Sequence, residues 1–481
     1  MCAMTHEAAQ GAGAEDAGEE RRLTTREAAE LLGVKPETVY AYVSRGQLSS
    51  RRSPGGRGST FGRAEVERLA GRTGRREARA AAGDLVFRTG ITLIEPDRYY
   101  YRGVDATDLA RRYGYEEVAE WIWTGELRPG ARFTAPPESL AAAGRVAAAL
   151  PSHSSATDRL RAAVAAAATV DPLRFDLSPQ GVLSSARGLI PTLVGALPVT
   201  AGQASDVEDA AGGSLAGQLW PRLADTPADP ASLAVLDTAL ALLADHDLAA
   251  STLAARVAAS AHANPYAVVS AGLGVLEGPL HGAASGLAHR MLSEVVDRGS
   301  AAPVVAGHLR TGRRVPGLGH RLYSGEDPRA RVLFTLLAEV PRAAPALAAA
   351  RDVVATTARH APLHANVDLA LAVLSVAYGM PAEAGETVFA VSRTAGWIAH
   401  ALEEYAERPL RMRPRGQYVG PRAPQPLPTP LPWPPSSPSP SVAPPSAPPS
   451  APVPPSAQVP SPAPVPSAPS PPPPSAPPAN Y

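Results

Sequence analysis

Histidine, aspartate and arginine side chains recur in the second half of the chain where helices are expected to begin or loops to turn. Histidine and aspartate are the side chains most often used to move protons in catalysis. The planar fork of arginine binds carboxylates through paired hydrogen bonds. The residues of this set are His246, His281, His320, Arg329, Asp368, Arg393 and Arg413.

Each of these residues also has a structural explanation when it is taken alone. A histidine beside glycine is more often a surface or core residue than a catalyst, and the basic run 408–415 would ordinarily be a solvated patch. His360 and His364 suggest a metal pair, but Pro362 between them interrupts a helical face, and no third ligand or H-E-x-x-H motif accompanies them. The run GLGH is too short for a dinucleotide fingerprint. We therefore expect no metal site.

The elements that would position these residues are helices. From Asp105 to about Glu407 nearly every ordered stretch is rich in Ala and Leu with helical periodicity. A body of about 300 residues exceeds the size at which a single core is usual, so we expect an all-α fold of two lobes with a cleft between them. Just before it, LVFRTGITLIEPDRYYYRG (residues 85–103) has the apolar and aromatic content of strands around turn residues and predicts one small hairpin.

A short module at residues 21–72 precedes this body. Thr24 and Glu27 are spaced as a capping box that opens a first helix, and Pro36 suits the first turn of a second. A basic, glycine-rich turn follows, then a third helix over about 63–69. Two short helices across a tight turn, followed by a basic hairpin-like element, resemble the winged helix-turn-helix of the excisionase or MerR type.

The charge placement of this module predicts that it binds duplex DNA. In its second helix, helical spacing puts Val39, Tyr40 and Val43 on the inner side. The alternative is a three-helix docking module with a solvated arginine loop. The residues expected to face DNA are Thr38, Tyr42, Arg45, Arg51, Arg52 and Arg57.

Composition divides the rest of the chain. Residues 1–20 are Gly, Ala and acid, too poor in large apolar groups to fold, and residues 73–84 form a charged linker. Of the 53 prolines, 28 lie in 421–481, where no charge follows Arg422, which predicts a disordered tail that samples polyproline II. The large domain is then expected to span residues 85–420.

The composition also restricts the class of protein. The 45 basic and 45 acidic residues balance, so no global field demands nucleic acid or membrane. The only cysteine is Cys2, which excludes a disulfide framework, a thiolate metal site and a cysteine nucleophile within the fold. The acidic start of the chain has no apolar core typical of a signal peptide, and no uncharged apolar run of about 18 residues follows. We expect a cytoplasmic protein.

Considered together, several segments resemble the citrate synthase family in order and spacing. The resemblance covers roughly residues 85–420. It predicts the fold of that family, which is all-α and two-lobed. The segments that carry it are YYYRGVDATDLA, PLHGAAS, PGLGHRLYSGEDPRAR, ANVDLALA, and RTAGWIAHALE followed by RPRGQYVG.

The resemblance implies condensation of acetyl-CoA with oxaloacetate and water to give citrate and CoA, the entry to the tricarboxylic acid cycle. It implies that Asp368 takes a proton from the acetyl methyl, while His281 donates a hydrogen bond to the thioester oxygen. His320 would hydrogen-bond the ketone of oxaloacetate and supply a proton as the carbon–carbon bond forms. Acetyl-CoA would be a substrate, and no permanently bound cofactor is implied.

The resemblance also assigns the binding residues. Arg413 would enter the site of the neighbouring subunit, so a homodimer or a multiple of dimers is implied. The ligands expected for oxaloacetate are His246, Arg329, Arg393 and Arg413. The loop expected to lie against the CoA adenine consists of Pro316, Gly317, Leu318 and Gly319.

The sequence departs from the family pattern at three positions. The family usually has Gly-Ala-Asn after the glycine of its LHG element, whereas Ala283 replaces the second glycine here and Ser285 replaces the asparagine. Ala249 stands where an asparagine often follows the His246 segment.

Two other functions stay open. A 2-methylcitrate synthase would use propionyl-CoA with the same three catalytic residues, and one methylene changes a pocket by only about 1–3 kcal/mol. An acyl-CoA-sensing DNA-binding regulator could reuse an enzyme body. The retention of His281, His320 and Asp368 argues against a pure sensor, which needs no base.

Overall fold

The structure is a computed structural model. The segments 1–20 and 73–84 and almost all of 421–481 lie outside the residues that it describes. The predicted disorder of 1–20 and 421–481 and the predicted linker 73–84 therefore stay predictions. The described residues are 22–32, 34, 36–44, 46–52, 59–67, 69, 87–203, 213–278, 281–282, 284–412, 414, 419–422 and 424–425.

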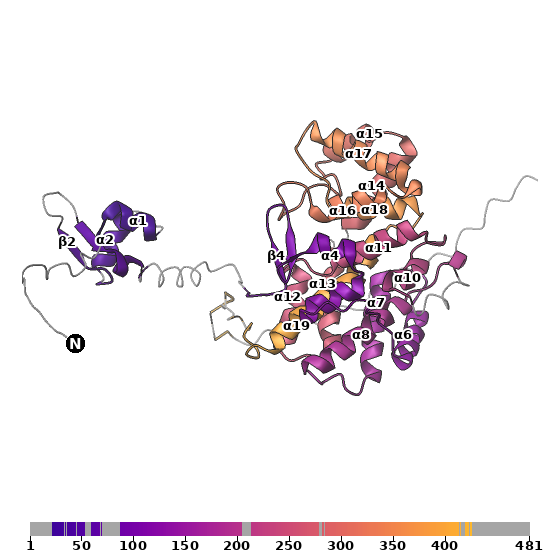
Figure 1. Ribbon diagram of the computed structural model, residues 1–481, viewed down its shortest axis with the longest axis horizontal. Helices are drawn as coiled ribbons and strands as arrows, with labels where there is room; N and C mark the ends of the chain where they lie inside the picture. Colours follow the sequence, from indigo (N-terminus) through magenta and orange to yellow (C-terminus); the bar gives the residue numbers. More distant parts are fainter. Residues whose placement is uncertain are drawn as a thin grey trace, which may run out of the picture. The chain divides into compact units, whose positions relative to one another are not determined.

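The N-terminal module is a helix-turn-helix with a small antiparallel sheet (Figure 1). The strands occur in the order β1-β3-β2, and residues 63–67 and 69 are again helical. The predicted capping box is confirmed, because the Thr24 amide donates to Glu27 Oε2 at 2.8 Å and the Glu27 amide donates to Thr24 Oγ1 at 3.3 Å. The elements are β1 (Arg22–Thr24), α1 (Thr25–Leu32), α2 (Pro36–Ser44), β2 (Ser50–Arg52) and β3 (Ser59–Gly62).

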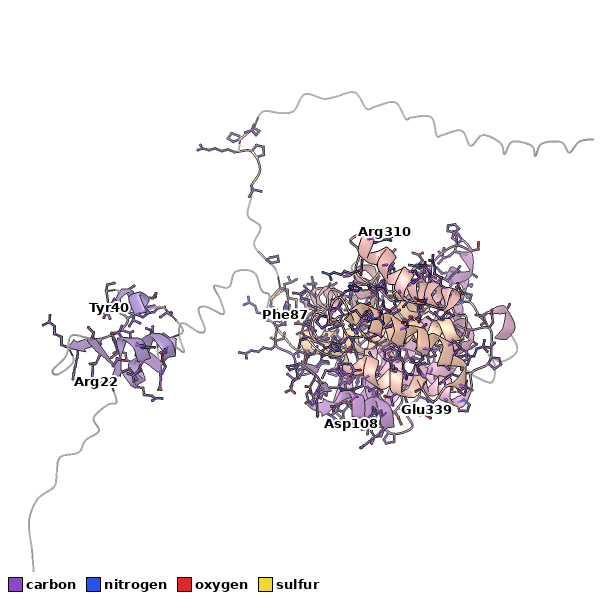
Figure 2. The ribbon with its side chains drawn as sticks, turned by 90° about the horizontal axis from the view of Figure 1, so that it is seen from above. Arg22, Tyr40, Phe87, Asp108, Arg310 and Glu339 are labelled. Carbon is purple, nitrogen blue, oxygen red and sulfur yellow. The ribbon has the colours of Figure 1, made fainter. Side chains whose placement is uncertain are left out.

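This module has its own apolar core, formed around Ala28, Val39 and Phe61. The predicted faces of α2 are wrong at two positions. Tyr42, expected to face DNA, is partly buried against this core, whereas Tyr40, expected inside, is 51% exposed (Figure 2). The reason is the phase of a nine-residue helix: Val39 and Val43 lie one turn apart and set the inner face, on which Tyr42 lies and Tyr40 does not.

The large body begins with a three-stranded sheet and continues as helices, which confirms the all-α prediction. The predicted hairpin has a third strand, β6, because the chain turns back again after Gly103. The elements of the first part are β4 (Thr92–Ile94), β5 (Tyr99–Tyr101), β6 (Val104–Asp105), α4 (Ala106–Arg112), α5 (Tyr115–Thr124), α6 (Pro137–Ala149), α7 (Ala156–Val170), α8 (Pro179–Gly195), η1 (Ala201–Gln203), α10 (Leu215–Leu219) and η2 (Trp220–Arg222).

The second part of the body supplies the residues of the site. Its elements are α11 (Pro230–Leu243), α12 (Ala250–Ser260), α13 (Pro265–Leu276), α14 (Ala284–Arg298), α15 (Ala302–Arg310), α16 (Pro328–Leu337), η3 (Pro341–Ala343), α17 (Ala344–Ala358), α18 (Val367–Ala377) and α19 (Ala384–Tyr405).

Two buried helices, α11 and α19, form the centre of the larger lobe. α11 is predominantly apolar, and most of its residues from Val235 to Leu243 are buried. α19 spans 22 residues and packs against α5, α8, α11, α12 and α13. Gly272 of α13 allows this close approach, because a Cβ atom there would lie 2.6 Å from the Trp397 indole. These contacts hold the ends of α11 and α12 in place, where the site is built.

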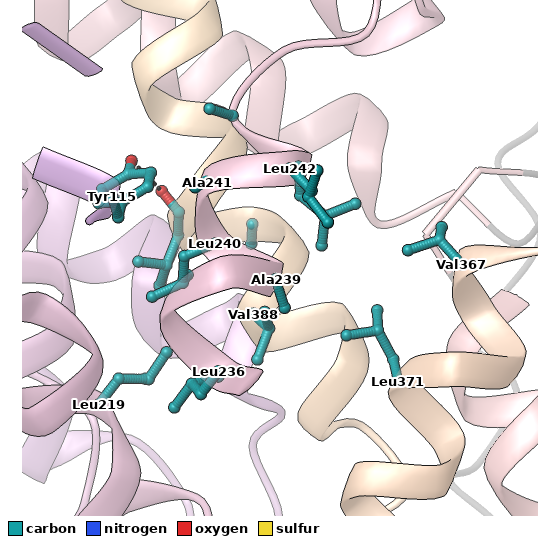
Figure 3. Close-up of a cluster of buried hydrophobic side chains, with 14 of the residues drawn as sticks. Tyr115, Leu219, Leu236, Ala239, Leu240, Ala241, Leu242, Val367, Leu371 and Val388 are labelled. Carbon is teal, nitrogen blue, oxygen red and sulfur yellow. Dashed lines mark hydrogen bonds between the residues drawn. The ribbon is translucent and has the colours of Figure 1, made fainter. Parts of the chain in front are cut away.

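The smaller lobe consists of α14 to α18, drawn in orange shades in Figure 1. It joins the larger lobe through α16 and α18 against α11 and through α14 against α19. In Figure 3 the side chains of Leu242 in α11 and of Val367 and Leu371 in α18 point into one apolar cluster. The two predicted lobes therefore share a continuous core, and the start of α18 is held against α11.

Within the described part of the chain, no single helix has both the length and the apolar composition of a membrane span. One pair of helical segments, Pro328–Leu337 and Pro341–Ala358, meets the criterion only when its two arms, bent by 112°, are counted together.

Candidate active site

Asp368 lies in the first turn of α18, where three contacts hold the backbone. The N-cap residue Asn366 accepts from the Asp368 amide at 3.0 Å, and its Nδ2 donates to the Gly319 carbonyl at 2.9 Å. Asp327 Oδ2 accepts from the Val367 amide at 3.0 Å. Burial raises the pKa of Asp368, although Ser285 and the Arg329 charge oppose the rise. This partly buried carboxylate therefore has the environment of a general base.

His320 lies in the turn before α16 and is neutral. Desolvation and the Arg329 charge lower its pKa to about 4. The Leu322 amide, in the same turn, donates to Nδ1 at 3.1 Å, so the single ring proton is on Nε2. Arg329 Nη2 lies 3.2 Å from that Nε2. With this tautomer two N–H donors lie next to each other, and a carbonyl or carboxylate oxygen bound beside them could accept from both.

Arg329 is 3% exposed and is held by the carboxylate of Asp327. Its Nε donates to Asp327 Oδ1 at 2.9 Å and its Nη2 to Oδ2 at 2.8 Å. Burial alone would lower the pKa of Arg329, but Asp327 raises it overall. Asp327 caps α16 and also binds the Val367 amide, so one carboxylate ties the Arg329 guanidinium to the turn that carries Asp368.

His246 follows the end of α11 and is buried against aromatic rings. Its Nε2 lies 2.8 Å from the Tyr323 hydroxyl, and its ring meets His320 edge-on at a centroid distance of 5.3 Å. Desolvation and the charges of Arg329 and Arg393 lower its pKa well below the usual range, so it is neutral. The Tyr99 hydroxyl of β5 donates to the Leu242 carbonyl at 3.0 Å and so holds the end of α11 from which His246 follows.

His281 lies in the turn between α13 and α14. Its Nε2 is 2.8 Å from the hydroxyl of Ser251, which is fully buried at the start of α12 and also receives a 3.4 Å hydrogen bond from the Trp397 indole. Desolvation and the Arg393 charge lower the pKa of His281. The contact with Ser251 leaves Nδ1 as the nitrogen available to a substrate.

Arg393 projects from α19 and is 1% exposed. Its Nε donates to the Leu243 carbonyl at 2.8 Å, and its guanidinium lies 4.3 Å from the centre of the Phe389 ring. Burial lowers the pKa of Arg393, which nevertheless stays charged. Its Nη2 makes no hydrogen bond within the described part of the chain, so this buried donor is suited to a carboxylate.

Behind Arg393 lies a buried chain of polar and charged side chains that the sequence analysis missed. His400 Nε2 is 3.3 Å from Asp245 Oδ1, and Arg256 Nη1 is 2.9 Å from His400 Nδ1. Burial alone would raise the pKa of Asp245, but His400 and Arg393 lower it overall. Arg256 and Arg411 both bind the buried carboxylate of Glu404. This chain connects the surroundings of Arg393 to the segment that leads to Arg413.

The loop Pro316–Gly319 contacts the turn before α18. The Asn366 amide donates to the Gly317 carbonyl at 3.0 Å, and the Gly319 amide donates to the His364 carbonyl at 2.8 Å. Gly317 has φ +77°, and a Cβ atom there would lie 2.8 Å from Leu369 Cβ. Only glycine permits this approach, so the predicted CoA loop and the turn that carries Asp368 form one unit.

Six of the seven histidine, aspartate and arginine residues singled out from the sequence are therefore linked in the structure, either by their own contacts or by contacts of adjacent residues. Arg413 lies outside the described residues. Among the DNA-facing residues, Arg51 and Arg52 are exposed on β2 and Thr38 is partly exposed, whereas Arg45 and Arg57 lie outside the described residues. Within the described ranges no group of three or more His, Cys, Asp and Glu side chains could hold a metal ion.

Four residues of the site had no role in the sequence analysis: Ser251, Ser285, Tyr323 and Asp327. Asp327 could have been found, because an aspartate before proline at a helix start is an N-cap signature and its carboxylate then lies near the first turn. Ser251 and Ser285 act on residues 30 and 83 positions away. Only the packing of helices reveals such pairs.

Comparison with known proteins agrees with this architecture. Residues 81–415 match the sequence profile described as citrate synthase, C-terminal domain, and residues 22–72 match one described as a helix-turn-helix domain. Citrate synthase of Haloferax volcanii is 32% identical over 366 residues, covering 71% of this chain and 95% of that protein. Citrate synthase 2 of Bacillus subtilis is 28% identical over 360 residues, covering 71% and 96%.

Solved structures show the same relationship. The citrate synthase of Thermotoga maritima covers 72% of this chain and 96% of its own, with 27% identity and a TM-score of 0.56. The citrate synthase of Pyrobaculum aerophilum covers 79% and 97%, with 25% identity and a TM-score of 0.60. The fold and these matches define an acyltransferase whose sequence is preceded by an N-terminal helix-turn-helix domain. The chain belongs to the citrate synthase family.

Proposed function

We propose that this protein condenses acetyl-CoA with oxaloacetate and water to give citrate and CoA. The observation that carries the proposal is the combination, in one helical body, of a carboxylate whose pKa is raised, two histidines whose pKa values are lowered and two buried arginines. A thioester methyl is a very weak carbon acid, so a base must act while the charge on the carbonyl oxygen is stabilised. Asp368 is the base in this proposal.

The histidines complete the proposed reaction. His281, with Nε2 accepting from Ser251, donates from Nδ1–H to the thioester oxygen as the acetyl group becomes an enol. The enol carbon then attacks the ketone carbon of oxaloacetate, and His320 donates from Nε2–H to the ketone oxygen, which becomes the hydroxyl of the product. Water hydrolyses the thioester and releases CoA. Arg329 and Arg393 bind the carboxylates of oxaloacetate, with His246 beside them.

Thiol release tests this function directly. Purified protein is mixed with oxaloacetate and either acetyl-CoA or propionyl-CoA, and free CoA is followed with a thiol reagent. We expect a higher kcat/KM with acetyl-CoA. A higher value with propionyl-CoA would assign 2-methylcitrate synthesis instead, and no release with either thioester would contradict the enzyme assignment. Omission of oxaloacetate is the control for simple thioester hydrolysis.

We also propose that the enzyme acts as a homodimer in which Arg413 binds oxaloacetate in the partner's site. Two contacts support this. Arg411 is anchored to Glu404 at 2.6 Å, and the Leu410 amide donates to the Ser260 carbonyl at 2.7 Å, so the chain is held just before Arg413. Exposed Val257 on α12 and Val275 on α13 offer apolar surface on neighbouring helices. Sedimentation of the active protein as a monomer at the assay concentration would contradict the dimer.

A second proposed function is binding of duplex DNA by the helix-turn-helix module. Its support is the pair of exposed arginines, Arg51 and Arg52, on β2, together with an α2 helix that exposes Tyr40. In a dimer, two such modules would be available to two half-sites. Tyr40 replaces Tyr42 as the residue of α2 proposed to reach the bases.

We expect the change of Arg51, Arg52 and Arg57 to alanine to weaken DNA binding without regard to sequence. Each lost phosphate contact makes the negative slope of log K against log salt less steep by about 0.9. The magnitude of the slope should therefore decrease by roughly three in the triple variant. Fluorescence anisotropy with genomic fragments at low and moderate salt measures it. The matched control removes the same charge from exposed positions of the body, by changing Arg310, Arg351 and Arg359 to alanine.

Two outcomes would contradict the DNA proposal: binding by the wild type that is insensitive to salt, and equal binding by the wild type and the triple variant. Deletion of residues 1–72 should leave condensation largely unchanged, because every proposed catalytic group lies beyond residue 240.

A further inference from the structure

Ser285 contacts the proposed base directly. It lies in the first turn of α14 and is 4% exposed, and its hydroxyl donates to Asp368 Oδ1 at 2.6 Å. A hydroxyl has one proton to donate, and an ionised carboxylate can only accept. The Ser285 proton is therefore committed to one oxygen of Asp368, in a charge-assisted hydrogen bond of the short and strong kind.

Three helices create the space for this contact. A Cβ atom at Gly385 of α19 would lie 2.6 Å from Ser285 Cβ and 3.1 Å from its Oγ, so glycine at this position lets α14 approach α19. At the next residue of α14, a Cβ atom on Gly286 would lie 3.2 Å from Glu386 Oε1. The serine is thus held from behind by α19 while its hydroxyl reaches α18. In the family pattern that this sequence resembles, asparagine usually stands at this position, where this chain has a hydroxyl.

The contact makes the two oxygens of Asp368 different. Oδ1 is bound to Ser285 and Oδ2 is not. The other charged groups that act on the carboxylate are Arg329 and Asp327 at the start of α16, and Glu386 on α19 is in turn influenced by Asp368. Ser285 and Arg329 favour the ionised form, whereas burial and Asp327 oppose it.

We propose that Ser285 is a positioning residue for the condensation: its hydroxyl holds one oxygen of Asp368 and leaves the other to take the proton from the acyl carbon. This assignment rests on the proposed function. It predicts that loss of the hydroxyl disturbs the chemical step and leaves oxaloacetate binding intact, because Arg329 is held by Asp327 and Arg393 by the Leu243 carbonyl.

The test is the pH dependence of thiol release by the Ser285→Ala variant. The base works only when ionised, so activity falls as pH decreases through its pKa. Because the hydroxyl favours the ionised form, its loss should move this acidic limb to higher pH. We expect kcat at pH 7 to fall about 10- to 100-fold, the size of one lost hydrogen bond to a charged group, with an unchanged KM for oxaloacetate.

Two further variants separate positioning from a structural role. Ser375→Ala removes another buried serine, on α18, whose hydroxyl bonds the Ala372 carbonyl and His289 instead of Asp368. It should leave the acidic limb in place. Ser285→Asn restores a donor of the family type and should recover part of kcat and return the limb toward the wild-type position.

The outcomes are distinct. A wild-type acidic limb and kcat in folded Ser285→Ala protein would overturn the positioning role while leaving the proposed function intact. An identical shift of the acidic limb in Ser375→Ala would mean that the effect comes from general destabilisation of α18. It would also overturn the positioning role of Ser285. Absence of thiol release by the wild type would overturn the proposed function and this assignment together. Circular dichroism and the Tm of each variant, measured first, confirm that folded proteins are compared.

Discussion

Replacement of Asp368 by asparagine should abolish condensation while oxaloacetate still binds. The amide keeps the shape of the side chain and an oxygen that accepts from Ser285, but it cannot take a proton from the acetyl methyl. General base catalysis contributes about 10²–10⁴-fold to a rate, so a loss of kcat in that range is expected. Thiol release measures kcat, and isothermal titration measures oxaloacetate binding.

A matched variant controls for the substitution itself. Asp297 is exposed on α14, and no hydrogen bond or ion pair to the site is seen for it within the described residues, so Asp297→Asn should behave as the wild type. If Asp368→Asn kept more than about a tenth of the wild-type turnover, the loss in barrier would be under about 1.4 kcal/mol and the base assignment would be wrong. Loss of oxaloacetate binding in the same variant would point to a binding role instead.

Replacement of Arg393 by methionine should raise the KM for oxaloacetate far more than it changes the KM for acetyl-CoA. Methionine fills a similar volume, but the buried donors of the guanidinium are lost and a substrate carboxylate is left without its partner. Truncation of one member of a buried charge pair costs about 2–5 kcal/mol, which corresponds to roughly a 30-fold or larger rise in KM. Initial rates over a series of oxaloacetate concentrations measure the effect.

Two comparisons make this result specific. Arg393→Lys keeps the charge without the planar fork and should fall between the wild type and Arg393→Met. Arg351→Met removes an exposed arginine from α17 and should change neither KM. Arg393 also donates to the Leu243 carbonyl, so the Tm of each variant is measured alongside. An unchanged KM for oxaloacetate in folded Arg393→Met would exclude this residue as a carboxylate ligand.

Some electrostatic features of the site follow from burial more than from any one residue type. His246, His281 and His320 are all shifted toward the neutral form, chiefly by desolvation and then by nearby arginine charges. The same cause, burial, raises the pKa of Asp368 above its value in solution. Burial therefore favours neutral histidine donors and a stronger base at once, which a solvated arrangement of the same residues would not.

Short-range patterns allowed the elements of this protein to be predicted from the sequence. The Thr24–Glu27 capping box is confirmed, because its two partners are only three residues apart. The helical body was predicted because apolar residues recur at helical spacing over some 300 positions. The segments around His281, His320, Asp368 and Arg393 were recognised because their order and spacing along the chain resemble those of the citrate synthase family.

The sequence was less informative where burial depends on the exact phase of a short helix. In α2, Tyr40 and Tyr42 are two residues apart on nine residues of helix, and the predicted inner and outer positions were exchanged. Nine residues make only about two and a half turns. Val39 and Val43 mark the inner face of this helix, so a small error in its phase exchanges the two tyrosines.

What the sequence determined by itself was therefore the helical class, the presence of a front module and the set of chemically competent side chains. What only the tertiary structure decided was which of them meet, and through which partners. Ser285 reaches Asp368 because glycine at 385 lets α14 approach α19, and Ser251 reaches His281 because α12 packs against α13, whose end leads to His281. These pairs are 83 and 30 residues apart. Contacts of that kind are set by the volumes of buried side chains between helices, which no local pattern in the chain encodes.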